Sequence, residues 1–310
     1  MDRKKDYLSI TPVVALLAFV SCALWGSAFS GVKRSYELLQ IQADEWADQL
    51  VFGGLRFVIA GMMVIAAGSI FAKKLLIPDR SALPKVCVIS FFQTVMQYFC
   101  YYIGLAHTSG VKASVLVGTN VFLAILISSL LLRLEHLTAR KLLGSVVGFS
   151  GIILINLKGL SAENSFTLSG DGLILLCTVA SGFSSAFMKK LSDNENPVML
   201  SGWQFFSGGA VLALIGIAFG GHFPRLTLYS GLLLLYLAFI SAAAYSVWAI
   251  LLKHNPVSRV SVFGFLNPVC GVLISAAVLH ESDQINVLFL LSLLLVCTGI
   301  VVVNAASDSC

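Results

Sequence analysis

Apolar runs, each about as long as a membrane span, follow one another through nearly the whole 310-residue chain. In a bilayer the backbone amides must be hydrogen-bonded within the protein, so a spanning segment is either an α-helix of about 20 apolar residues or a strand of a closed barrel. Long runs favour the helix, and the predicted fold class is an all-α integral membrane protein. Ten spans are predicted, over residues 12–32, 50–72, 85–106, 111–132, 142–157, 171–190, 199–220, 228–252, 257–279 and 286–304.

The chain has too few charged residues to cover a water-exposed surface. They make up 11% of the chain and hydrophobic residues 58%, whereas soluble domains have about 25% charged and about 45–50% apolar residues. This composition excludes a soluble enzyme, a secreted disulfide scaffold and a disordered tail. A net charge of +5 is too small for a nucleic-acid binder. The seven cysteines show no metal-ligand spacing, so we expect neither a metal site nor a cofactor.

The positions of the Lys and Arg residues predict how the chain crosses the membrane. If the N-terminus is cytoplasmic, 14 of the 20 lie on the cytoplasmic side, five lie on the other side, and Arg56 lies within a helix. Cytoplasmic loops carry the excess of Lys and Arg in membrane proteins. We therefore expect a multi-pass protein of the plasma membrane with both termini in the cytoplasm.

The sequence contains an internal repeat. A shift of 147 residues aligns Asn120 with Asn267, and a shift of 148 aligns Arg56 with Gln204. Each predicted repeat contains five spans, and this odd number gives the second repeat the opposite orientation in the membrane. Inverted repeats hold a binding site near the midplane, at the interface between them. The two predicted repeats cover residues 1–160 and 161–310.

A set of small and polar residues near the helix ends recurs in both halves in one arrangement. These residues include Gly104, Ala106-His107-Thr108-Ser109, Leu132, Glu135, Gly144 and the run 151–156, together with Trp25-Gly26-Ser27, Leu55-Arg56-Phe57 and Glu281. The arrangement resembles the EamA domain of the drug/metabolite transporter superfamily. The resemblance implies ten helices, cytoplasmic termini and the export of small metabolites, often amino acids. It also implies a cavity lined by the first four spans of each repeat, with the fifth span outside it.

One position departs from the pattern of that family. The family has a proline partway along the fourth span of each repeat, but here Pro268 is present only in the second repeat and Val121 takes the equivalent place. Because a proline loosens a helix locally, the span over 111–132 is predicted to be straighter than the span over 257–279.

Aromatic residues on the third span of each repeat are candidates for the walls of a binding site. Tyr98 and Tyr101 lie three residues apart and so share a helix face, and the repeat aligns them with Tyr245 and Trp248. Such pairs predict ring walls that face each other across a pseudo-twofold axis. An interfacial aromatic belt is the alternative, but the neighbouring Gln97 favours a cavity because a belt needs no amide there.

Other polar residues inside the spans are candidates because polar groups in lipid are costly unless they face protein or water. Asn120 and Asn267 either bind substrate or hydrogen-bond between helices. Trp25, Ser27 and Ser185 are further candidates for the lining. The full set of candidate substrate-binding residues is Trp25, Ser27, Arg56, Gln97, Tyr98, Tyr101, Asn120, Ser185, Gln204, Tyr245, Trp248 and Asn267.

Arg56 is the most informative charge in the sequence. A guanidinium inside a helix needs an anion, a carbonyl or water, and it can clamp a substrate carboxylate through two hydrogen bonds. The alternative is an interfacial side chain that reaches the membrane surface, and the repeat partner Gln204 is neutral. Glu135 and Glu281 lie beyond helix ends and are predicted to be turn and capping groups rather than proton carriers. The sequence does not identify a coupling ion.

Two rival functions are weighed against a transporter of amino acids. Gly148-Phe149-Ser150-Gly151 matches an intramembrane serine protease, but the five histidines fall at helix ends, so a glycine packing stripe is the better interpretation. A nucleotide-sugar or phosphometabolite carrier of the same superfamily needs several central cations, and only Arg56 is available. We therefore predict a transporter, not an enzyme, that exports amino acids or similar metabolites by alternating access. Its expected partners are a small-molecule substrate and the lipid bilayer, with no nucleic acid, and it is expected to be a monomer or homodimer.

Overall fold

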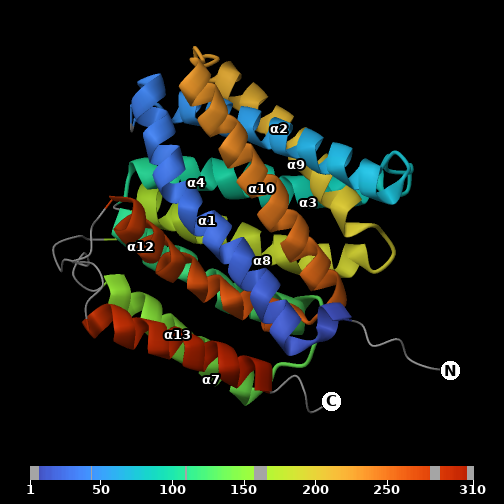
Figure 1. Ribbon diagram of the computed structural model, residues 1–310, viewed down its shortest axis with the longest axis vertical. Helices are drawn as coiled ribbons and strands as arrows, with labels where there is room; N and C mark the ends of the chain where they lie inside the picture. The colour runs from blue at the N-terminus through green and yellow to red at the C-terminus, as the bar shows by residue number, and fades with distance from the viewer. Residues whose placement is uncertain (1–6, 43, 109, 157–165, 280–286, 306–310) are drawn as a thin grey trace.

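The computed structural model describes residues 7–42, 44–108, 110–156, 166–279 and 287–305, and within these residues it contains helices and no strand (Figure 1). The chain starts with a short 3-10 turn (Tyr7–Ser9), α1 (Thr11–Leu39) and α2 (Trp46–Ala72). The next segment forms α3 (Leu83–Ile89), a π-helical turn (Ser90–Met96), α4 (Gln97–Ala106), α5 (Gly110–Gly118), α6 (Asn120–Leu126), a second π-helical turn (Ile127–Leu131) and α7 (Ala139–Asn156). The all-helical prediction is confirmed for the described part of the chain.

The described part of the second half of the chain is also helical. It consists of a π-helical turn (Leu168–Gly172), α8 (Leu173–Ser192), α9 (Pro197–Ala218), α10 (Leu228–His254), α11 (Val257–Ser261), a 3-10 segment (Val262–Phe265), α12 (Leu266–Leu279) and α13 (Val287–Ala305).

Seven helices in the described residues are long and apolar enough to cross a membrane. The predicted spans over 111–132, 142–157 and 257–279 are not among them. The first and third are divided into shorter helices, and the second, α7, has Arg140 and Lys141 in its first turn. Helix length and composition therefore leave the prediction of ten spans unconfirmed.

The two divided spans are interrupted at equivalent places. The span over 111–132 breaks at Thr119, between α5 and α6, and the Thr119 hydroxyl donates to the carbonyl of Leu116 at 2.6 Å. The span over 257–279 changes to a 3-10 segment just before Asn267 and Pro268. The first span is thus interrupted although it has no proline at Val121. The hydroxyl bond of Thr119 to its own helix supplies a local reason.

Glycines allow pairs of helices to touch through their backbones. A Cβ on Gly54 of α2 would lie 2.6 Å from the carbonyl oxygen of Gly209 on α9, and one on Gly144 of α7 would lie 2.9 Å from that of Gly299 on α13. Small residues let membrane helices approach this closely. Figure 1 shows the α2–α9 pair and the α7–α13 pair at opposite sides of the bundle. The contacts of Gly144 agree with the packing stripe predicted for this helix.

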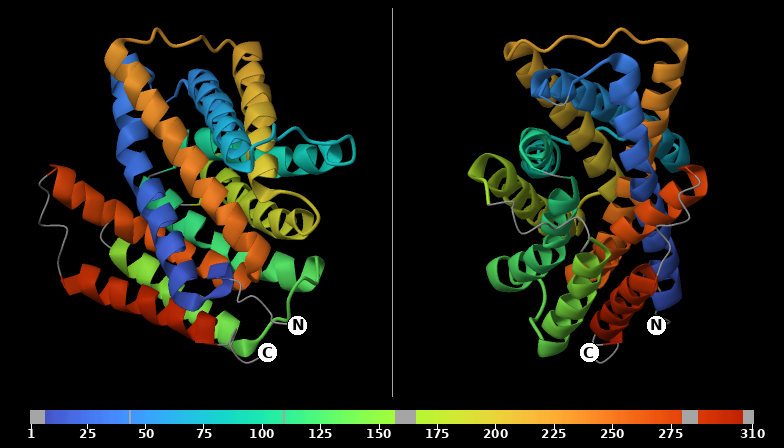
Figure 2. Two further views of the ribbon diagram at one scale, coloured as in Figure 1. Left: turned by 45° about the vertical axis from the view of Figure 1, so that its right-hand side comes forward. Right: turned by 90° about the vertical axis from the view of Figure 1, so that its left-hand side faces the viewer.

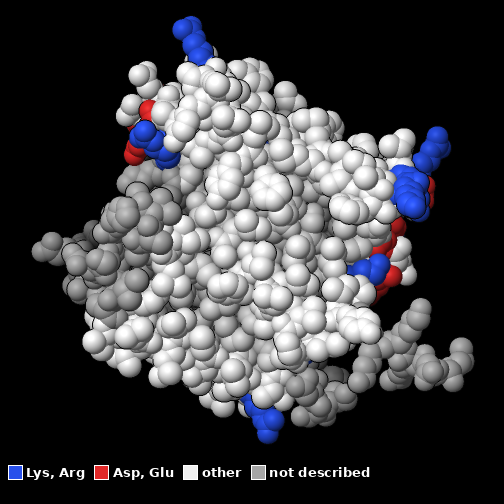
Figure 3. Space-filling model, in the orientation of Figure 1, with Lys and Arg blue, Asp and Glu red and all other residues white. Residues whose placement is uncertain are grey.

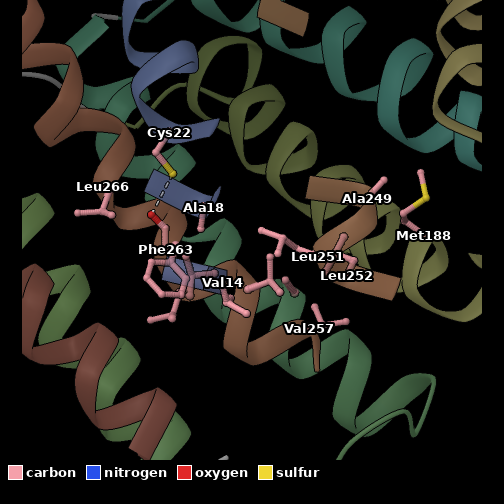
Figure 4. Close-up of a cluster of buried hydrophobic side chains, with 14 of the residues drawn as sticks. Val14, Ala18, Cys22, Met188, Ala249, Leu251, Leu252, Val257, Phe263 and Leu266 are labelled. Carbon is pink, nitrogen blue, oxygen red and sulfur yellow. Dashed lines mark hydrogen bonds between the residues drawn. The ribbon is translucent and has the colours of Figure 1, made fainter. Parts of the chain in front are cut away.

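In Figure 1, α1, α8, α10 and α12 lie between these two pairs; α1 packs against α10 and α12, and Figure 2 shows the arrangement from two further sides. The thiol of Cys22 on α1 donates to the carbonyl oxygen of Phe263 at 3.2 Å (Figure 4). Val14 and Ala18 continue this apolar contact along α1. One carbonyl of the 3-10 segment therefore finds a partner outside its own helix.

The exterior suits a lipid environment. In Figure 3 the charged side chains lie near the margins of the visible face, and its centre is uncharged. Large apolar side chains such as Leu16, Phe19 and Leu294 are exposed. On a chain of this composition, such a surface faces acyl chains.

One arginine brings the two described ends of the chain to the same end of the bundle. The Arg259 guanidinium in α11 donates to Thr11 Oγ1, at the start of α1, and to Asn304 Oδ1, near the end of α13. The turn before α7 lies at the same end, because the Glu135 carboxylate accepts a hydrogen bond from the backbone N–H of Ser258. We call this the Arg259 end.

Candidate functional site

Two tyrosines from the two halves of the chain meet in the middle of the molecule. The hydroxyl oxygens of Tyr98 on α4 and Tyr245 on α10 lie 2.8 Å apart. These residues are equivalent under the shift of 147 residues in the sequence. Equivalent residues of two symmetric halves contact each other only near the axis that relates them. The hydrogen bond therefore marks the pseudo-twofold axis that the repeat predicts.

Aromatic rings from α1, α2 and α9 surround this tyrosine pair. The Trp25 ring meets the Tyr245 ring edge-on with centroids 4.8 Å apart, and the Phe57 ring lies 4.4 Å from that of Tyr98. Phe57 and Phe205 stack at 5.3 Å, and Phe205 also contacts Tyr245 at 5.1 Å. The aromatic cluster, as we call it, consists of Trp25, Phe57, Tyr98, Tyr101, Phe205, Tyr245 and Trp248.

Phe57 and Phe205 were not among the sequence candidates. The repeat nevertheless contained the signal, because Leu55-Arg56-Phe57 aligns with Trp203-Gln204-Phe205 and the phenylalanine is the identical residue in that match. Both side chains are fully buried. An identical residue next to the paired polar positions could have identified them.

The predicted facing walls are only partly formed. Tyr101 contacts Tyr98 and Tyr102 on its own helix, whereas Trp248 contacts Trp25 at 5.1 Å. Among the described ring contacts, none joins Tyr101 to Trp248. The two halves meet through the tyrosine pair, through Phe57 against Phe205, and through Trp25 against Tyr245 and Trp248.

Arg56 is buried and braces α2 against α10. Its side chain is only 4% exposed. The guanidinium donates from Nε and Nη2 to the hydroxyl oxygen of Ser241, at 3.0 and 2.8 Å, and from Nε to the carbonyl of Leu237 at 3.2 Å. Burial excludes the interpretation of a side chain that reaches the membrane surface. A guanidinium has five N–H donors, so these bonds leave others for a substrate carboxylate.

Gln204 makes the equivalent contact in the other half. Its side-chain oxygen accepts a hydrogen bond of 2.7 Å from the hydroxyl of Thr94. The shift of 147 aligns Thr94 with Ser241, just as the shift of 148 aligns Gln204 with Arg56. The brace between the second span of one repeat and the third span of the other therefore occurs twice. Only one of the two copies carries a charge.

Buried polar atoms of four candidate residues and of Gln93 have no hydrogen-bond partner in the protein. Two are donors, Trp25 Nε1 and Gln204 Nε2. Three are amide oxygens, those of Gln93, Asn120 and Asn267. Buried polar groups are normally hydrogen-bonded, so each such atom needs an explanation. The predicted alternative, in which the asparagines bond between helices, is not seen at either amide oxygen.

Asn267 lies near Trp25. On α1, Trp25 directly precedes Gly26, and a Cβ on Gly26 would lie 2.8 Å from the backbone nitrogen of Gly271 on α12. Asn267 lies one turn before Gly271 on that helix. The helix contact thus brings the turn of α12 that carries Asn267 close to the turn of α1 that carries Trp25.

The remaining sequence candidates differ in their placement. Gln97 is half-buried next to Tyr98, and Ser185 is half-buried on α8. Ser27 donates to the carbonyl of Leu24, and its hydroxyl oxygen lies 2.9 Å from that of the exposed Tyr236. Tyr236 precedes Tyr245 by nine residues, or about 13 Å along α10. The structure therefore places Ser27 away from the aromatic cluster.

The serine of the protease-like motif is engaged with its own helix. The Ser150 hydroxyl donates to the carbonyl of Val146 at 2.9 Å on an exposed face of α7. A nucleophilic serine needs a histidine base within hydrogen-bond reach, and none of the described hydrogen bonds supplies one. Within the described residues, no group of three or more His, Cys, Asp or Glu side chains could hold a metal ion.

Glu135 bonds to residues on either side of its own turn, and it also joins the two halves. Its carboxylate accepts hydrogen bonds from the Ser128 hydroxyl at 2.6 Å, from Lys141 Nζ at 2.7 Å and from the backbone N–H of Ser258 at 2.9 Å. The hydroxyl of Ser258 is a fourth donor. The contact with Ser258 could not be inferred from a turn motif, since 123 residues separate the two. Glu281 lies outside the described residues.

The model of the EamA-like transporter family matches residues 13–157 and again residues 168–305. The chain belongs to this family. The predicted resemblance is thereby confirmed, and this EamA-like protein is a multi-pass membrane transporter with a small-molecule substrate.

Relatives of this EamA-like transporter come from distant organisms. An uncharacterized transporter of Archaeoglobus fulgidus is 26% identical over 271 residues, which cover 84% of this chain and 88% of that protein. The uncharacterized transporter YvbV of Bacillus subtilis is 25% identical over 305 residues, covering 96% and 93%. One solved protein crystal structure matches with a TM-score of 0.78 and 18% identity, covering 96% of this chain and 99% of the other. That structure has the same fold.

Proposed function

We propose that this transporter exports amino acids or similarly small metabolites across the plasma membrane by alternating access. In this proposal ten spans form two inverted repeats, residues 1–160 and 161–310, and both termini are cytoplasmic. The Arg259 end then faces the cytoplasm. The position of the Lys and Arg residues supports that orientation, and so does the shared location of Thr11 and Asn304 at one end.

The single observation that carries the proposal is the aromatic cluster around the Tyr98–Tyr245 contact. Residues of both halves build it, and it lies where the repeat register brings equivalent residues together. A site on the axis between inverted repeats is accessible from either face when the halves rock. Aromatic rings offer apolar contact area to the body of a small molecule.

The unpaired polar atoms favour a substrate that has both an ammonium and a carboxylate group. The amide oxygens of Gln93, Asn120 and Asn267 have no partner, and they can accept hydrogen bonds from an ammonium. Trp25 Nε1 and Gln204 Nε2 have no partner either, and they can donate hydrogen bonds to a carboxylate. A zwitterionic amino acid supplies both partners. A purely apolar compound would leave all five atoms unpaired.

The charge of Arg56 supports the same substrate class. Its partners in the structure are a hydroxyl and a carbonyl, and it also lies over the Phe57 ring. Among the described residues, no carboxylate lies within ion-pair distance of Arg56. A buried cation without a counter-charge is costly, so a bound carboxylate near Arg56 would be stabilised. One cation suits one carboxylate better than the several charges of a phosphometabolite or nucleotide sugar.

A thermal-shift experiment on the purified transporter tests the proposal. Phenylalanine, its decarboxylated amine phenethylamine and the amine-free acid 3-phenylpropionate share one ring and differ only in their charged groups. We expect phenylalanine to raise the melting temperature most, because only it pairs with donors and acceptors together. A wider amino acid panel and uptake into proteoliposomes then identify the preferred member. Equal or absent stabilisation by the whole amino acid panel would refute the substrate class.

A further inference from the structure

The Glu135 carboxylate accepts four hydrogen bonds at the Arg259 end and belongs to no part of the aromatic cluster. Its side chain is 6% exposed, and that of its ion-pair partner Lys141 is 11% exposed. Its two oxygens accept hydrogen bonds from two hydroxyl groups, one backbone N–H and one ammonium group. Hydrogen bonds to an ionised acceptor are about twice as strong as neutral ones.

The donors come from three different helices. Ser128 lies in the π-helical turn that ends the span over 111–132, and Lys141 lies in the first turn of α7. Ser258 lies in the first turn of α11, in the second half of the chain. One carboxylate thus ties two helices of the first half to the start of a helix in the second half.

The residue after Ser258 ties α11 to other helices. The Arg259 guanidinium donates to Thr11 on α1, to Asn255 and to Asn304 on α13. The start of α11 is therefore held by Arg259 on one side and by Glu135 on the other. For this end of the bundle to open between α11 and the turn that carries Glu135, the bonds from Ser258 to Glu135 must break.

We propose that Glu135 is a gate residue, whose hydrogen bonds to Ser258 hold the transporter closed at the Arg259 end. This inference rests on the alternating-access part of the proposed function and is independent of the substrate class. Alternating access requires that each end can open, and a contact between halves at one end is what such a transition separates. Glu135 acts by positioning α11 and does not touch the substrate.

The substitution Glu135→Gln weakens this contact without removing its volume. A glutamine side chain has only one acceptor oxygen, and its NH2 group cannot accept the bonds that the second carboxylate oxygen receives. It also removes the negative charge that pairs with Lys141. A group that only caps a helix would affect the melting temperature, whereas a gate also controls how often the end is open.

Position 261 offers a reporter of opening. Ser261 lies about one turn after Ser258, is 3% exposed, and its hydroxyl oxygen has no partner. In a Ser261→Cys protein, the reaction of this position with a maleimide is followed by peptide mass spectrometry, so the native cysteines can stay. The measurement is made without substrate.

We expect Glu135→Gln to raise the labelling rate at position 261 by about tenfold or more, since charge-assisted bonds across the gate are lost. Ser258→Ala removes one hydroxyl and keeps the backbone donor, so its effect is smaller, about two- to fivefold. Glu37→Gln is the matched control, because it changes an exposed carboxylate that pairs with Arg34 within α1. It should leave the rate unchanged.

An unchanged labelling rate in folded Glu135→Gln protein would overturn the gate. If that variant fails to fold, Ser258→Ala decides alone, and an unchanged rate there overturns the gate as well. The expected increase in labelling, together with no stabilisation by any amino acid in the thermal-shift experiment, would support the gate and refute only the proposed substrate class.

Discussion

Arg56→Gln separates the role of a brace from the role of a carboxylate partner. It reproduces the residue of the second repeat, where Gln204 bonds Thr94, so the glutamine can bond Ser241 in the same manner. The positive charge is lost, however. We expect the loss of the charge-assisted contact to a substrate carboxylate to cost about 1.5–3 kcal/mol.

A loss of this size predicts a measurable change in selectivity. Since about 1.4 kcal/mol is a tenfold change in affinity, the preference for phenylalanine over phenethylamine should fall by about 10- to 150-fold in Arg56→Gln. Competition binding to purified protein measures this ratio. Ser241→Ala is the control, because it removes the brace and keeps the charge, so stability should fall while the ratio stays close to that of the parent. A ratio within twofold of the parent in Arg56→Gln would refute the carboxylate role and leave Arg56 as a brace.

Three further predictions concern the ring walls, the orientation and the packing. Tyr101→Ala and Trp248→Ala should each impair transport in proteoliposomes without loss of membrane insertion, and normal transport in both would assign these rings to an interfacial belt. A cysteine at position 140 in place of Arg140 should react with an impermeant reagent only from the cytoplasm; labelling only from outside would invert the topology. Gly54→Ala should destabilise the protein by about 1–3 kcal/mol, because its Cβ would lie 2.5 Å from the backbone nitrogen of Ala213. Gly231→Ala, where a Cβ meets nothing within 4 Å, should not lower the melting temperature, and an equal loss in both would contradict the packing argument.

The membrane class and the central tyrosine pair could be predicted from the sequence because their causes are local or repeated. The length of an apolar run must match the bilayer, and it can be read without any tertiary contact. The repeat register pairs Tyr98 with Tyr245, and residues near a twofold axis meet their own equivalents. The same shift of 147 residues aligns Asn120 with Asn267, so the sequence also predicts that these two residues occupy equivalent places.

The tertiary structure alone decided what the polar side chains bind. Arg56 reaches Ser241 across 185 residues, and Glu135 reaches Ser258 across 123. Ser27 shares a helix with Trp25 but meets Tyr236 instead of the aromatic cluster. Hydrophobic pattern shows that a segment is buried in lipid or protein, but not which helix lies against which. That choice depends on backbone contacts such as Gly54 against Gly209, and these require two distant glycine surfaces to fit each other in three dimensions.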